Sequence, residues 1–323
     1  VSNSAIGVPN GHMDGTVAVP CNSVEECVEM VQKLHKQKVD LIKIMVTGGV
    51  IDALVPGEPG VLRMPAEYVK AVCDEAHKLG LKVAAHAESN EGVKVCIENG
   101  VDTIEHGAEL TRELVKIMKN ENKSLVCTLS PAVPLALLDE QKTGCDSNVQ
   151  LNTYVVLHKI ISGVRTALEN NVPVGLGTDT GSPFVTHYNF YRELVWYQNI
   201  FGVTNQFAIH TATLLNAKIL GKDNLIGSIE NGKLADIVIY EKNPLDDLNN
   251  LKEPLYVIKD GEIINNLKIK KSEYLNNCLD EIMNVEVEKL IDSQYPNIKK
   301  IIYSKEPNSD FQSIGLSRHI LDK

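Results

Sequence analysis

Four side chains able to bind a metal or move a proton stand in or just after predicted β-strands. Lys43 lies inside an apolar run, His86 and His106 each close one, and Asp179 stands two residues past another. Because the carboxyl ends of parallel strands meet at one edge of a sheet, where such folds place active sites, we expect these residues to converge. Imidazole and carboxylate suit a divalent ion such as zinc, so the pattern predicts a metal site.

Lys43 is the most informative of the four because its neighbours in the strand are all apolar. A charged ammonium there is costly unless it is paired or neutralised, and an amine with a lowered pKa becomes nucleophilic. One outcome is reaction with carbon dioxide to give a carbamate, whose anionic oxygens can bridge two metal ions. The alternative is a lysine that forms a salt bridge with a carboxylate or extends toward solvent.

The other three residues also have a simpler interpretation. A histidine at a strand end is often only a hydrogen-bonded core residue, and Asp179 could cap a turn. The shared position of His86 and His106, between Lys43 and Asp179, favours metal ligation instead. The same position favours Asp179 as both ligand and general base.

The sequence also argues against several classes of function. Lys+Arg 32 against Asp+Glu 42 gives a net charge of −10 without a basic cluster, which argues against nucleic acid or an anionic membrane as partner. The sequence contains no GxSxG elbow, no P-loop and no apolar run of ~20 residues. Widely spaced cysteines and the lack of a signal segment favour a cytoplasmic protein. His12 and His187 lie in loops, and we expect both to contact a small-molecule substrate.

The elements that would position these residues alternate between helix and strand. Helical spacing or capping signals mark segments near 23–34, 65–79, 91–99, 111–120, 151–170, 189–201 and 204–220. Five continuously apolar runs lie between them, at 41–46, 81–86, 101–106, 124–129 and 172–177. The alternation predicts parallel strands covered by helices, in a doubly wound sheet or in part of an eight-stranded barrel.

Outside these units the pattern changes. Residues 1–20 are rich in Gly, Pro, Asn and Ser and are expected to form a loop, and 130–148 is poorly patterned. Short strands are predicted at 226–229, 236–240, 255–259 and 262–264. Near-helical spacing after 268 predicts an amphipathic helix followed by a weakly structured end. The expected organisation is a partial barrel over 1–225, a β-sandwich element over 226–267 and a helical tail over 268–323.

Four short segments together resemble the metal-dependent amidohydrolase superfamily. Its imidazolonepropionase-related, prolidase-like branch, which hydrolyses Xaa-Pro and similar dipeptides, is the most similar. The segments are IKIMVTGG at 42–49, AAHA at 84–87, TIEHG at 103–107 and LGTDTG at 176–181. A further segment, IGSIENGKLADIV at 226–238, resembles the return of that family into a small β-sandwich.

The resemblance implies a (β/α)8 TIM barrel of the amidohydrolase type with a β-sandwich flank. It implies that Lys43 is the carboxylated lysine bridging two divalent metals, with zinc the expected ion. His86 and His106 would be further ligands, and Asp179 the ligand that takes a proton from the attacking water. The implied activity is hydrolysis of amide bonds in dipeptides or cyclic amides.

One family motif is absent, because nothing before Lys43 contains the His-x-His pair of strand one. About five of the eight βα units are present, so we interpret the chain as the C-terminal portion of such an enzyme or a natural truncation. The alternatives are a catalytically incomplete fragment or paralogue, and a mononuclear deaminase-type amidohydrolase, against which Lys43 argues. An incomplete barrel exposes strand edges, which favours a homo-oligomer or a complementing N-terminal segment.

Overall fold

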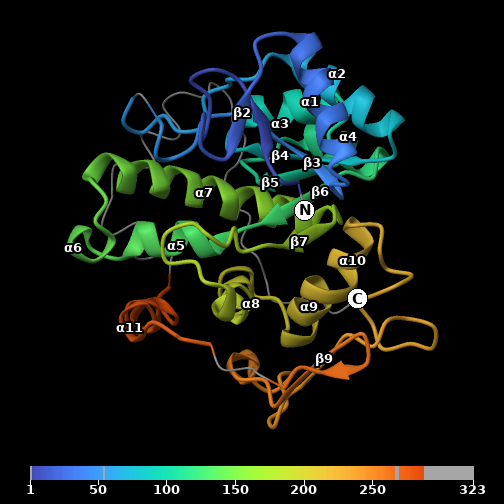
Figure 1. Ribbon diagram of the computed structural model, residues 1–323. Coiled ribbons are helices and arrows are strands. Elements are labelled where there is room, and N and C mark those ends of the chain that lie inside the picture. The colour runs from blue at the N-terminus through green and yellow to red at the C-terminus, as the bar shows by residue number, and fades with distance from the viewer. Residues whose placement is uncertain (1, 54, 266–268, 287–323) are drawn as a thin grey trace. The chain divides into compact units, whose positions relative to one another are not determined.

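The structure is a computed structural model that describes residues 2–53, 55–265 and 269–286 (Figure 1). Internal contacts divide the chain into two compact units. The first comprises Val1–Cys127 and Asp146–Val174, and the second Thr128–Cys145 and Gly175–Lys323. The three segments expected from the sequence, 1–225, 226–267 and 268–323, stay a prediction about domain organisation.

Seven short strands form one sheet in the order β2-β1-β3-β4-β5-β6-β7. Their bounds are β1 Ala5–Gly7, β2 Ala18–Pro20, β3 Leu41–Met45, β4 Lys82–Ala87, β5 Thr103–His106, β6 Ser124–Cys127 and β7 Val174–Leu176. The pairing is parallel from β2 through β6. The five strands predicted from apolar runs are confirmed as β3 to β7.

The expectation of a loop over residues 1–20 is wrong, because this segment contains two further strands of the sheet. This segment contributes β1, which pairs with β3, and β2, which pairs with β1. Both strands are three residues long, and Gly7 and Pro20 end them. Strands this short give no measurable periodicity, so composition alone indicated a loop.

Helices of the first unit cover one face of its sheet. They are α1 Val24–Lys36, α2 Ala66–Lys78, α3 Asn90–Glu98, α4 Arg112–Asn120 and α7 Ser147–Glu169. Helices α2 and α3 pack on β4, and α7 packs on β6. Ile42, Ile44 and Ile104 are fully buried in this core, whereas the intervening Lys43 and Glu105 are only partly buried. The opposite face of the sheet therefore carries the polar side chains.

Local signals in the sequence set the ends of these helices. The Ser23 hydroxyl accepts the Glu26 N–H at 3.2 Å at the start of α1, and Thr111 caps α4 in the same way through Leu114. Gly80, with φ 76°, follows α2 in the left-handed conformation that ends helices. The predicted helices of this unit are accordingly confirmed, with every end within four residues of its predicted position.

The second unit combines helices with a three-stranded antiparallel sheet of order β10-β9-β8. The helices are α5 Leu129–Leu137, α6 Glu140–Thr143, η1 His187–Asn189, α8 Phe190–Phe201, α9 Asn205–His210, the π-helical η2 Thr211–Leu215, α10 Asn216–Ile219, η3 Leu248–Lys252 and α11 Glu273–Ile282. The strands are β8 Ile237–Ile239, β9 Tyr256–Lys259 and β10 Glu262–Ile263. Within the described part of the chain, no helix combines the length and apolarity that crossing a bilayer requires.

One expectation for this unit is wrong, and others are confirmed. Residues 226–229 form a bend over 226–228 instead of a strand. The poorly patterned stretch 130–148 contains most of α5 and all of α6. The remaining short strands are confirmed as β8 to β10, and the tail helix as α11. The weakly structured end expected for the tail lies outside the described residues.

Candidate active site

His86 lies at the carboxyl edge of the sheet in the first unit, on the same face as Lys43. The register pairs Lys43 with Ala84 and Met45 with His86, so alternation along both strands turns Lys43 and His86 to one side. His86 is buried, and its Nε2 lies 3.2 Å from the carbonyl oxygen of Gly48. The polar face thus presents an amine and an imidazole in adjacent strands.

His106 joins this pair through an unusual backbone conformation. Its φ is 65°, and the N–H of Gly107 donates to the carbonyl of Glu105 at 2.8 Å, which is a tight turn centred on His106. Extended backbone would direct His106 to the face opposite Glu105. The turn instead sets the His106 ring edge-on to His86, with centroids 4.8 Å apart and planes at 69°. A strained non-glycine residue of this kind suggests a functional position.

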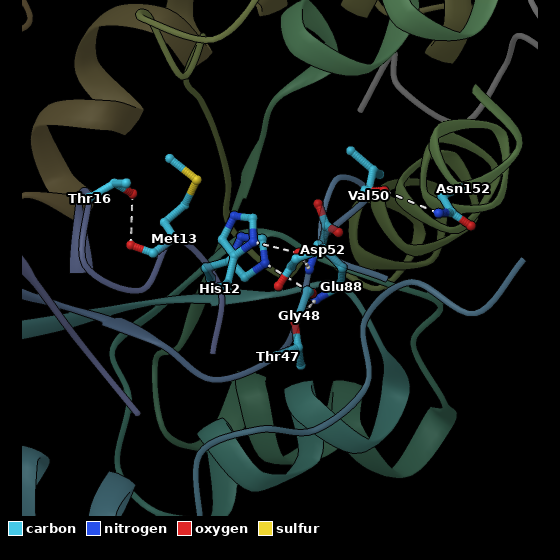
Figure 2. Close-up of polar contacts among 11 residues, drawn as sticks. His12, Met13, Thr16, Thr47, Gly48, Val50, Asp52, Glu88 and Asn152 are labelled. Atoms are coloured by element: carbon cyan, nitrogen blue, oxygen red, sulfur yellow. Dashed lines mark hydrogen bonds and ion pairs between the residues drawn. The ribbon is translucent and has the colours of Figure 1, made fainter. Parts of the chain in front are cut away.

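A third imidazole reaches the cluster from the loop after β1. The ring of His12 stacks on His86, with centroids 4.2 Å apart and planes within 8°. Its Nδ1 lies 2.9 Å from Oδ1 of Asp52, as the dashed line in Figure 2 shows. The same carboxylate oxygen accepts the N–H of Gly49 at 2.7 Å. His12, His86 and His106 therefore form one continuous group of rings.

The electrostatics of the cluster keep its central ring neutral. Burial holds the pKa of the His86 imidazole well below its ordinary value, and its electrostatic interactions with His106, His12 and Lys43 lower that pKa further. This effect also places Lys43 within electrostatic reach of His86. Burial alone would raise the pKa of Asp52, but hydrogen bonds from His12 and Gly49 outweigh it, so the pKa of this carboxyl is lowered.

The donor chemistry fits a divalent cation in part. Two adjacent imidazoles, one of them neutral, are groups from which such sites are built. Among the described residues, however, no group of three or more His, Cys, Asp and Glu side chains is arranged to hold a metal ion. The residues of the first unit thus supply some ligands of a metal site and need others.

The remaining predicted site residues, Asp179 and His187, belong to the second unit. Asp179 follows β7 with φ 51°, and its Oδ2 accepts the Ser182 hydroxyl at 2.8 Å. His187 begins η1 and lines a cavity of about 550 Å³ together with Tyr188 and Tyr240. The two units are separate bodies, so the ligand role of Asp179 and the substrate contact of His187 stay predictions.

Sequence reasoning missed Asp52 and Gly49. Asp52 lies in an irregular segment after β3 and has no recurring spacing to mark it. The signal that could have drawn attention to Gly49 is the Gly48-Gly49 pair directly after β3, because glycine marks places where other groups approach the backbone closely. A Cβ on Gly49 would lie 2.5 Å from Cε1 of His12.

Comparison with known proteins gives consistent results. The model of the amidohydrolase family matches residues 5–264. Ochratoxinase from Aspergillus niger is 26% identical over 248 residues, which cover 75% of this chain and 50% of that protein. Imidazolonepropionase from Caldanaerobacter subterraneus subsp. tengcongensis is 27% identical over 184 residues, covering 56% and 39%. The chain spans half or less of the length of these two relatives.

Solved structures show the same likeness in three dimensions. A Bifidobacterium longum protein proposed to be a prolidase has a TM-score of 0.78 and 38% identity, covering 83% of this chain and 66% of that one. An Xaa-Pro dipeptidase with methionine bound in its active site has a TM-score of 0.71 and 31% identity, covering 80% and 66%. These likenesses confirm the expected amidohydrolase-type α/β fold. Since the family model matches most of its length, the chain belongs to the amidohydrolase family.

Proposed function

We propose that the protein containing this chain is a metal-dependent hydrolase of amide bonds in small substrates, either dipeptides or cyclic amides. The observation that carries the proposal is the packing of His86 against His106 at the carboxyl edge of a parallel sheet, with Lys43 on the same face. This edge is where α/β folds place their catalytic groups. Relatives named Xaa-Pro dipeptidase and imidazolonepropionase support an amide substrate of small size.

Each proposed residue has a defined task. Lys43, as a carbamate, would supply anionic oxygen, and His86 and His106 would supply neutral imidazole nitrogens to two divalent ions, with zinc the expected metal. Asp179 would complete the ligand set and accept a proton at its carboxylate. When bound, such a metal polarises the amide carbonyl and lowers the pKa of water. His12 and His187 would contact the substrate.

A second candidate is that this chain alone is catalytically incomplete. The observation in its favour is that, among the described residues, no three side chains of His, Cys, Asp or Glu are arranged so that they could hold a metal ion. The activity would then require residues that lie outside this polypeptide. The metal content of this polypeptide distinguishes the hydrolase from the incomplete chain. The incomplete chain should retain less than one equivalent of zinc after desalting.

The test uses protein expressed from the complete reading frame in the presence of zinc and bicarbonate. Xaa-Pro dipeptides and cyclic amides are supplied, and release of amine or ring opening is measured. Lys43→Ala should lower kcat/KM by more than about 100-fold, because even supporting residues of metal sites are worth 10- to 100-fold. Lys94→Ala, which removes a lysine from the surface of α3, is the matched control and should remain active. Failure of the unmodified protein to cleave any of these amides would overturn the proposal.

A further inference from the structure

The loop that carries His12 is folded so tightly that it fixes where this ring can lie. Asn10 and Met13, on either side of His12, both have left-handed backbone, with φ 58° and 55°. The Asn10 N–H donates to Oδ2 of Asp14 at 2.8 Å, and the N–H groups of Val17 and Ala18 both donate to the carbonyl of Met13. The backbone thus delivers His12 to one place beside His86.

Two residues from the segment after β3 then fix the orientation of the ring. Oδ1 of Asp52 lies 2.9 Å from Nδ1 of His12, and it is itself held by the Gly49 N–H at 2.7 Å. The carboxylate is therefore in place independently of the ring. Because a carboxylate oxygen only accepts, the His12 proton in the neutral ring belongs on Nδ1, and the lone pair belongs on Nε2.

Gly49 provides the space that the ring occupies. A Cβ at this position would lie 2.5 Å from Cε1 and 2.8 Å from Nδ1 of His12, which is closer than Cβ atoms approach their neighbours in proteins. The backbone of Gly49 is not in the left-handed conformation that would itself require glycine. Its lack of a side chain therefore serves the imidazole and not the backbone.

We propose that Asp52 and Gly49 are positioning residues for His12, and that they present its Nε2 as a hydrogen-bond acceptor to a donor group of the substrate bound beside His86. This inference rests on the proposed amide hydrolysis. Side chains of the pair are 14% exposed for His12 and 27% for Asp52, so a bound molecule can reach the ring. Among the residues that the structure describes, Asp52 is the hydrogen-bond partner of the His12 ring and occupies Nδ1. Nε2 is therefore the nitrogen that can bind the substrate.

The first test measures the ring itself and needs no activity. Long-range ¹H–¹⁵N spectra of this polypeptide with ¹⁵N-histidine, recorded in alkaline buffer and assigned with His12→Gln, report which nitrogen carries the proton. The Nδ1-protonated form should dominate, and Asp52→Ala should shift the ring toward the Nε2-protonated form. Gly49→Ala should move the His12 signals, whereas Lys94→Ala on the surface of α3 should leave them unchanged. An unchanged His12 ring in Asp52→Ala would overturn the proposal.

The second test uses kinetics of the protein from the complete reading frame. His12→Ala and Asp52→Ala should each lower kcat/KM by about 10- to 100-fold, the usual cost of misplacing a group at an active site. The double variant should be no slower than His12→Ala, because Asp52 acts only through the ring. Asp52→Asn keeps an acceptor oxygen and should recover part of the loss. Additive losses would mean that Asp52 has a separate structural role and would overturn the proposal. If no amide is cleaved, the proposed function fails while the spectra still decide the positioning role.

Discussion

Replacement of Glu193 by alanine should weaken the second unit more than any surface substitution. This α8 side chain is fully buried, and its carboxylate accepts the N–H groups of Leu129 and Ser130 at 2.8 and 2.7 Å as well as the Ser130 hydroxyl. It thereby caps α5, whose own N-cap residue, Thr128, forms no side-chain cap hydrogen bond. A carboxylate from another helix is the principal partner of this helix start.

The expected loss follows from the number of groups left without an acceptor. Each buried polar group that loses its partner costs about 1–3 kcal/mol, and three groups depend on this carboxylate, so Glu193→Ala should cost roughly 3–9 kcal/mol. Glu193→Gln retains one acceptor oxygen and should cost about half as much. Glu140→Ala, at an exposed position of α6, should change the free energy of unfolding by less than about 0.5 kcal/mol.

The assay is a urea titration followed by the fluorescence of Trp196. This residue is the single tryptophan of the chain, is 2% exposed and lies on α8 one turn after Glu193. Its emission therefore reports the unfolding of the second unit even when the first unit unfolds separately. A loss below about 1 kcal/mol in Glu193→Ala, or one equal to that of Glu140→Ala, would refute the capping argument.

Two further predictions concern titratable groups. The Asp260 N–H and the Lys259 ammonium lower the pKa of Asp236, so its contribution to the β8–β10 sheet is present above the unfolded carboxyl pKa of about 3.9 and is lost as pH falls through the folded-state pKa. Asp236→Asn should remove this acid sensitivity in hydrogen exchange of β9 amides, and equal sensitivity in both proteins would contradict the assignment. All seven cysteines are free thiols, Cys145 is the least buried, and burial raises the pKa of Cys73 to about 12. A thiol reagent at neutral pH should therefore modify Cys145 first and Cys73 only after unfolding, as mass spectrometry of peptides would show.

The sequence predicted the parts of the fold in which many residues repeat one signal. Ser23 and Thr111 marked helix starts because capping depends on residue type within one turn. Continuous apolar runs marked β3 to β7 because buried parallel strands need them. Segment 226–229 is only partly apolar and forms a bend, in which Gly227 has φ 94° and a Cβ on it would lie 2.7 Å from that of Ala217.

The candidate site was predictable in its residue types but not in its geometry. His86 and His106 could be named from their places at strand ends, and the structure brings their rings together. The conformation that turns His106 toward His86 could not be predicted from the sequence, in which only the following Gly107 indicates a turn. The link between His12 and Asp52 spans 40 residues, so no local pattern in the sequence marks it.

The turn at His106 also predicts which part of the protein loses its structure first on heating. A non-glycine residue at φ 65° persists only while its surroundings oppose relaxation, and here Leu125 occupies the space beside Gly107, with its Cδ1 2.4 Å from where a Cβ would be. Modest loosening around β6 would release the imidazole from its place while the rest of the unit stays folded. Heating should accordingly separate the His106 and His86 rings before the unit as a whole unfolds.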